Sequence, residues 1–411
     1  MLRQIILLIT LISFSVQVIA QELHLNIHQE VNKVLEPKEG GLDLKQIQDL
    51  TLNDQIDLKI SYERLFQAQK KIAQARAEYF PYGLGTIAAM YFLNVWNPLI
   101  LVELVTSLPS KWYNVQSEKN LRWAQKYSFK ALEHNIKAQV AHLYYGLLKE
   151  EATLKLTEVQ IRLMEKLLTA VKEEVELGIS DYTDIENLEI RILDARDIYL
   201  KFSAYHAQST AAFNQMISQD PEFSKLAKLQ PVAEFNVRDE YTTNLEQAAL
   251  AAVERAPEIV SADYMIVAAR KAKKSIRWSV LSFSGIGFGY WSRVQVAGSK
   301  VEAAELNREL VETTIKNQVY VTHSAFMRAM DLFNAEEAIS SGTSFFTEVK
   351  IEQFKGREVS LRTLLETELL FVKDYTETIV AHYDSLIKKI DFERAILGTA
   401  KDPSIQTNLN I

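Results

Sequence analysis

The histidines are the first side chains to examine for metal chemistry. His24 and His28 are four residues apart, a spacing that places two imidazoles on one face of a helix, as in many metal-binding pairs. The sequence offers no further ligands beside them, so we interpret both as surface residues near the start of the chain. The chain contains no cysteine. This composition excludes disulfides, thiolate metal sites and a cysteine nucleophile.

Paired carboxylates are the next candidates for chemistry. Glu150 with Glu151 and Glu173 with Glu174 lie in long amphipathic segments, where a solvated charge is the ordinary interpretation. The sequence has neither a phosphate-cradling glycine loop nor the turn motif of a nucleophilic serine. We therefore predict no catalytic residue, no metal and no cofactor, and expect the chain not to be an enzyme. A formal charge of -7 argues against binding to nucleic acid.

The first twenty residues predict a secretory signal peptide. Arg3 supplies the positive start, the stretch from Ile5 to Ile19 is mostly apolar, and Ala20 ends a short cleavage pattern. The stretch is short for a membrane span, which needs roughly 20 apolar residues. No later segment has the pattern of a transmembrane helix. An exported chain of this kind is either periplasmic or an outer-membrane protein.

Helix breakers are sparse in two long stretches. No proline falls between Pro109 and Pro221 or between Pro257 and Pro403, and few glycines do. Such stretches favour very long helices.

The first stretch predicts a long helix and a shorter return. A helix over about 118–177 has a length of roughly 90 Å at ~1.5 Å per residue. The return over about 182–216 spans only roughly 50 Å. An unpaired half of the long helix would expose its apolar stripe, so a second short helix is expected to stack end to end with the return. The amphipathic segment 52–79 is the candidate.

A seven-residue apolar repeat supports this hairpin. The positions that carry it are Val140, Leu147, Leu154, Ile161, Leu168 and Val175. A sustained heptad pattern makes helices pack side by side.

The second half of the chain repeats the plan of the first. The segment 136–140 (IKAQV) recurs at 315–319 (IKNQV), and the glycine-containing segment from Val175 parallels the one from Glu352. Gly178 follows Gln139 and Gly356 follows Gln318 at nearly equal distances, which indicates an internal duplication. Each half is predicted as a short helix, an apolar block, a very long helix, a glycine turn and a short helix.

The two apolar blocks are the predicted strands. They span about 83–109 and 277–298, and in the second the glycines at 285, 287 and 289 mark a tight reversal. Two strands of about nine residues around such a turn are long enough to cross an outer membrane. The first block alternates poorly and fits a helix equally well.

Taken together, these features resemble the outer-membrane efflux (TolC-like) family over nearly the whole mature chain. The resemblance rests on the two glycine turns, on the segment AALAAVERAPEI with Pro257, and on Ala77 to Pro81 before an apolar block. It implies a mainly α fold of very long antiparallel helical hairpins that form an α-barrel. It also implies that each of three chains gives four strands to one trimeric transmembrane β-barrel.

The resemblance also implies site residues. In the family, the glycine turns are tips that meet a periplasmic adaptor of an inner-membrane pump. The positions transferred here are Gly178, Ser180, Asp181 and Tyr182 in the first tip, and Lys355, Gly356, Arg357 and Ser360 in the second. Both glycines are expected to supply the positive φ that a helix hairpin needs.

A tunnel constriction near the tips is a further expectation. Arg362 and Leu365 stand where family members often carry acidic residues, so an acidic ring from the second tip is not expected. Asp184 holds the corresponding place after Gly178, where it is either part of a ring of charges or a solvated carboxylate.

The predicted organisation follows from these elements. A signal peptide (1–20) and an N-terminal extension (21–43) precede the first repeat (44–217), and a linker (218–243) leads to the second repeat (244–397) and a tail (398–411). The predicted function is a passive homotrimeric channel in the cell outer membrane, in contact with lipid and serving a tripartite efflux or type I secretion system. The alternative is a periplasmic coiled-coil scaffold with degenerate strands and no pore.

Overall fold

The structure is a computed structural model that describes residues 27–36, 41–79, 98–217, 229–231, 245–282, 287 and 289–396. The chain divides into two compact units that both draw on each half of the sequence. The first unit takes residues 1–51, 139–238 and 325–390, and the second takes 52–138, 239–324 and 391–411. The predicted signal peptide and C-terminal tail lie outside the described residues.

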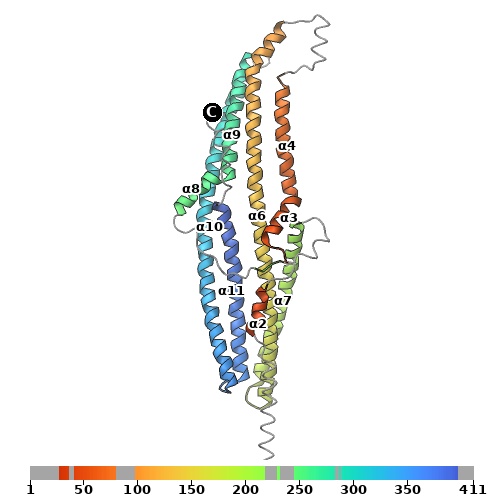
Figure 1. The fold of residues 1–411 in the computed structure, drawn as a ribbon, viewed down its shortest axis with the longest axis vertical. Coiled ribbons are helices and arrows are strands. Elements are labelled where there is room, and N and C mark those ends of the chain that lie inside the picture. The colour runs from red at the N-terminus through yellow and green to blue at the C-terminus, as the bar shows by residue number, and fades with distance from the viewer. Residues whose placement is uncertain are drawn as a thin grey trace, which may run out of the picture. The chain divides into compact units, whose positions relative to one another are not determined.

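Helices dominate both units (Figure 1). In chain order they are α2 (Ile27–Asn32), the 3-10 turn η1 (Lys33–Leu35), α3 (Leu44–Asp54), α4 (Ile56–Ala77), α6 (Pro98–Glu176), α7 (Tyr182–Ile217), α8 (Leu245–Arg255), α9 (Pro257–Trp278), the 3-10 turn η3 (Ser279–Leu281), α10 (Tyr290–Lys355) and α11 (Leu361–Ile396). The predicted return helix agrees with α7 to within one residue at its end. The long helix α6 is longer than the predicted one, because it begins at Pro98 and continues through Pro109.

The predicted strands are not found where the structure describes these blocks. Residues 98–109 belong to α6, 277–281 belong to α9 and η3, and 290–298 form the start of α10. The strand assignment is therefore wrong for these residues. Their apolar side chains belong to helices and do not alternate between the two faces of a strand. Residues 83–97, 283–286 and 288 lie outside the described residues. Among the described helices, none is both long and apolar enough to span a membrane.

The internal duplication is visible in the lengths of the helices. Both α7 and α11 have 36 residues, and their starts (361 − 182) and ends (396 − 217) differ by 179. The helices α3 and α8 have 11 residues each, α4 and α9 have 22 each, and both pairs of starts differ by 201 (245 − 44 and 257 − 56). The offset thus drops by 22 residues between α4 and α6, in the region of the first apolar block.

The heptad row packs differently in the two long helices. In α6, Val140 and Leu147 are buried, but the later members of the row are only half-buried. Five of the six positions 179 residues later in α10 are buried: Val319, Phe326, Phe333, Ser340 and Thr347. The sixth, Phe354, is half-buried. In α6 the later buried positions include Leu156, Leu163 and Ala170, which form a second row of seven-residue spacing on a different face of the helix.

The first unit contains the N-terminal part of the chain as well as the hairpins. In α2 and η1, Ile27, Val31 and Val34 are buried. Glu30 in α2 forms an ion pair with Arg162 in α6 at 2.9 Å, and the ring of His28 lies 4.9 Å from that of Phe371 in α11. α2 therefore contacts both hairpins of this unit. His24, the other histidine of the predicted pair, lies outside the described residues.

In the second unit, α9 packs closely on α6. The Ser261 hydroxyl donates a hydrogen bond to the Ala124 carbonyl, and the Ser117 hydroxyl donates one to the Ala268 carbonyl, both at 2.9 Å. Short side chains let the helix backbones approach each other, and each buried hydroxyl finds an acceptor there. Tyr264 stacks on Tyr127 beside these contacts, with ring centroids 5.9 Å apart.

Candidate functional site: the helical tips

The first predicted tip is a glycine-terminated helix end. The N–H of Gly178 donates to the Val175 carbonyl at 2.9 Å, and the N–H of Ile179 donates to the Glu174 carbonyl at 2.8 Å. This pair of bonds is the Schellman motif, which needs a left-handed residue just past the helix. Gly178 is that residue, with φ of 71°.

The second tip uses an arginine in the same role, which corrects the prediction for Gly356. The N–H of Arg357 donates to the Phe354 carbonyl and that of Glu358 to the Gln353 carbonyl, at 2.9 and 2.8 Å. Arg357 has φ of 63°, and Gly356 is the last residue before it. Arg357 follows Gly178 by 179 residues, so the two turns are equivalent once the repeat is aligned on the helices. A non-glycine residue in this conformation costs roughly 1–2 kcal/mol.

Arg362 joins the two tips within the first unit. One of its terminal nitrogens lies 3.1 Å from a carboxylate oxygen of Asp184, 3.2 Å from the Ser180 hydroxyl and 3.5 Å from Glu174. The Ser180 hydroxyl itself donates to Glu174 at 2.8 Å. The predicted constriction residues Asp184 and Arg362 are thus neighbours in the same chain and form an ion pair.

A third carboxylate contacts Arg362 from its own helix. Its Nε donates to Glu366 at 3.1 Å. The hydrogen bonds that Arg362 donates to Glu366 and then to Asp184 raise its pKa above its already high ordinary value. The guanidinium is therefore charged at every physiological pH.

Apolar side chains that the sequence analysis did not select surround the first tip. Leu177 and Ile179 are 74% and 71% exposed, and the predicted residue Tyr182 is also exposed. At the aligned positions of the second tip stand Gly356, Glu358 and Leu361. A sequence signal for this exposed apolar surface exists: large apolar residues stand on both sides of a glycine that ends a helix. The turn at such a glycine projects into solvent, so these side chains are exposed.

The remaining predicted tip residues surround these contacts. Asp181 is exposed, Lys355 forms an exposed ion pair with Glu352 at 2.7 Å, and the Ser360 hydroxyl lies 3.0 Å from that of Thr363. The Ser360 hydroxyl also accepts a hydrogen bond from the Thr363 N–H, and so caps the start of α11. No group of acidic or histidine side chains that could hold a metal is found in the described ranges.

One predicted solvated carboxylate is in fact buried. Glu150 is 7% exposed and accepts hydrogen bonds from the Ser209 hydroxyl at 3.1 Å and from His206 Nδ1 at 3.0 Å. The solvated interpretation was wrong for Glu150, because α7 covers this face of α6. The two partners satisfy a carboxylate that would otherwise be costly to bury.

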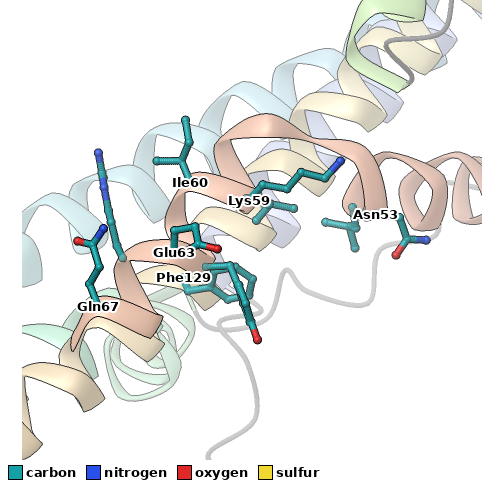
Figure 2. A pocket seen from close by; sticks show the side chains of 10 residues that line it. Asn53, Lys59, Ile60, Glu63, Gln67 and Phe129 are labelled. Atoms are coloured by element: carbon teal, nitrogen blue, oxygen red, sulfur yellow. The ribbon is translucent and has the colours of Figure 1, made fainter. Parts of the chain in front are cut away.

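A groove of about 750 Å³ opens beside α4 in the second unit (Figure 2). Its lining combines apolar residues such as Leu58 and Ile60 with the charged Glu63, and with Phe129 from α6. Lys59 in this lining is paired with Asp54 at 3.2 Å.

Comparisons with known proteins bear on the fold. No family model matches the sequence, and no curated protein matches it. The CmeC outer membrane channel of Campylobacter jejuni is similar in structure, with a TM-score of 0.68 at 11% identity over 89% of this chain and 88% of that one. The outer membrane protein VceC of Vibrio cholerae has a TM-score of 0.67 at 10% identity, over 86% and 96%.

A third structure gives the same result. CusC, described in terms of transmembrane channel formation, has a TM-score of 0.67 at 14% identity over 87% of this chain and 92% of that one. The chain therefore has the helical architecture of outer-membrane channels, the TolC-like fold that its sequence resembles.

Proposed function

We propose that the chain is a passive export channel in the outer membrane, with most of its length in the periplasm. The observation that carries this proposal is the match in fold over 86–89% of the chain to outer-membrane channels of nearly the same length. A channel works through its shape and wall charge, and needs no catalytic group.

In this proposal, copies of the chain assemble around a central tunnel as a homotrimer. Export energy comes from an inner-membrane pump, of the tripartite efflux or type I secretion kind, that reaches the tips through a periplasmic adaptor. The residues that would dock the adaptor are Gly178, Ser180, Asp181, Tyr182, Lys355, Gly356, Arg357 and Ser360. The exposed Leu177 and Ile179 would add an apolar contact to the first tip.

The contacts of Arg362 give the closed end of such a tunnel a physical basis. Arg362 ties the second tip to Asp184 and Glu174 of the first. A tunnel that opens by separating the tips must break these bonds. We propose Asp184 and Arg362 as part of the constriction on this ground.

Single-channel recording tests the central claim. The full chain, purified from outer membranes and added to a planar bilayer, is expected to show discrete conductance steps with a preference for cations, given the net charge of -7. A clear anion preference would contradict the charge argument. Absence of any conductance from a trimeric preparation would contradict the channel itself.

Adaptor docking needs its own experiment. Changing both Leu177 and Ile179 to Asp is expected to stop export of a fluorescent cation from cells, while conductance in the bilayer is retained. Leu250→Asp is a matched control, because Leu250 is 54% exposed on α8, far from the tips in sequence. Export that survives the double change would refute the assignment of the tips.

A scaffold without a pore is the second candidate. One observation favours it: residues 290–298, predicted as a strand, form the first turns of α10. We expect extraction to separate the two functions. A channel needs detergent for release from membranes, whereas a scaffold is released by osmotic shock alone.

A further inference from the structure

The two repeats bury unequal faces, although their helices are equivalent. In α11, Val372 and Ile379 are fully buried. The residues 179 positions earlier in α7, Leu193 and Leu200, are also apolar but are 63% and 66% exposed. The buried face of α7 lies about 100° further round the helix, where Ile185 and Ile192 are 7% and 5% exposed.

The long helices show the same inequality. Leu167 and Ala170 of α6 are 4% and 7% exposed. Their equivalents in α10, Phe346 and Val349, are 47% and 37% exposed. Both outer surfaces lie in the first unit, on α7 of the first hairpin and on α10 of the second. Here they are named the α7 edge (Glu186, Ile190, Leu193 and Leu200) and the α10 edge (Ala335, Gly342, Phe346, Val349 and Lys350).

The buried counterparts of these edges belong to one internal interface. Gln160 of α6 contacts Thr376 of α11 at 3.5 Å, and Glu174 of α6 contacts Arg362 of α11 at 3.5 Å. Both steps are 14 residues (174 − 160 and 376 − 362), so the antiparallel register is constant between them. Leu167, midway along α6, therefore lies level with Leu369 of α11.

We propose that the α10 edge of one copy packs on the α7 edge of the next copy in the register that α6 and α11 use inside the chain. This inference rests on the proposed channel assembly and deepens it by naming the partner surface. The aligned register places Phe346 of one copy level with Ile190 of the next. A surface that joins two different edges is head-to-tail, and such contacts close into rings when the rotation allows.

Side-chain volumes and charges fit this pairing. The α10 edge has the small residues Ala335 and Gly342 at the positions where α6 has Leu156 and Leu163. In the proposed register, Ala335 lies next to the level of Leu200 in the other copy, and Gly342 lies next to the level of Leu193. Large side chains opposite small ones fill an interface without overlap.

The charges at the edge are complementary as well. Val171 and Leu365, both 2% exposed, are level with each other inside the chain. Their equivalents at the outer edges are Lys350 and Glu186, which carry opposite charges. An apolar pair in the interior is thus replaced by a matched ion pair between copies.

Cysteine cross-linking tests the register, and the chain has no cysteine of its own. The double variant Phe346→Cys with Ile190→Cys is expected to form, on mild oxidation, a covalent ladder that ends at a closed oligomer on a non-reducing gel. The control pairs Phe346→Cys with Ile198→Cys, because Ile198 is equally exposed but lies eight residues, or about 12 Å, further along α7. The control is expected to remain unlinked.

A charge exchange provides a second measurement. Lys350→Glu is expected to weaken assembly by about two- to fivefold, as for a partly exposed ion pair. Adding Glu186→Lys is expected to restore it. An oligomer that forms without the 346–190 link, or with equal linking in the control, overturns the register but leaves the channel proposal intact. A chain that stays monomeric overturns the interface, and single-channel recording then decides the channel proposal separately.

Discussion

Acid is expected to destabilise the chain through His382. This residue lies in α11, outside the predicted membrane-spanning blocks, and is 0% exposed. Its ring contacts those of Phe333 in α10 and Tyr383, with centroids 5.4 and 5.3 Å away. Burial among these side chains disfavours the charged imidazolium and lowers the pKa of His382 from 6.5 to about 4.

The sign and size of the effect follow from linkage. Since the folded pKa is the lower one, the unfolded chain binds more protons between pH 6.5 and 4, and stability falls as the pH drops through this window. A shift of this size lowers the free energy of unfolding by about 2 kcal/mol at pH 5 and about 3 kcal/mol at pH 4. The stabilisation is fully present above pH 7.

Denaturant unfolding at fixed protein concentration measures this effect. The free energy of unfolding, followed by tryptophan fluorescence at pH 7.5 and pH 5, is compared between the native chain and His382→Leu. Leucine is apolar and does not titrate, so the loss between the two pH values is expected to be about 2 kcal/mol smaller in the variant. Other titrating groups contribute to both chains and cancel in this difference. An equal loss in both would refute the reasoning.

Four other changes probe the tips and the buried carboxylate. Arg357→Gly is expected to stabilise the chain by about 1 kcal/mol, because glycine adopts the left-handed conformation without strain. Gly178→Ala is expected to destabilise it by a similar amount through the backbone alone, since an added Cβ meets nothing within 4 Å. Glu150→Ala is expected to cost about 1–3 kcal/mol by removing the acceptor of His206. The melting temperature measures all three. Arg362→Ala is expected to raise the open fraction of single channels, because it removes the bonds between the tips.

Each of these changes has a control in the same chain. The two tip changes have opposite expected signs, so a shift in the same direction for both would contradict the backbone argument. Glu150→Gln keeps an acceptor oxygen and is expected to lose less than Glu150→Ala. Arg362→Lys keeps the charge with fewer donors. If the Arg362→Lys channel were open for a larger fraction of the time than the Arg362→Ala channel, these bonds would not hold the tips together.

The long helices were predictable from the sequence because the signal is simple. Missing breakers and a repeated apolar spacing predicted a hairpin return at Tyr182 that the structure contains. The heptad row was less well predicted. It describes α10 better than α6, because α6 has a second helix, α11, on a neighbouring face, and burial shifts toward it. One amphipathic pattern cannot show how many neighbours a helix has.

The turn of the second hairpin shows a different limit. Gly356 was the expected left-handed residue, since glycine tolerates positive φ better than any other residue. The helix lengths place Arg357 there, one position later. The preference of glycine for positive φ did not decide which residue adopts the left-handed conformation. The register of the two packed helices did. Glu150 was misjudged for a related reason: the chemistry of a carboxylate predicts solvent, and only the helix opposite it explains its burial.

The constant offset of 179 residues has an evolutionary consequence. In the hairpins α6–α7 and α10–α11, inserting or deleting one residue would rotate every later side chain by about 100° around its helix. There α6 and α11 each contact two helices of the same chain, whereas α7 and α10 each contact one such helix and carry a proposed edge. Such a rotation would therefore misalign two contacts of a helix at once. Changes of length are therefore expected to be selected against in the hairpins. The 22-residue difference between the repeats lies upstream, and relatives of this chain should vary in length there.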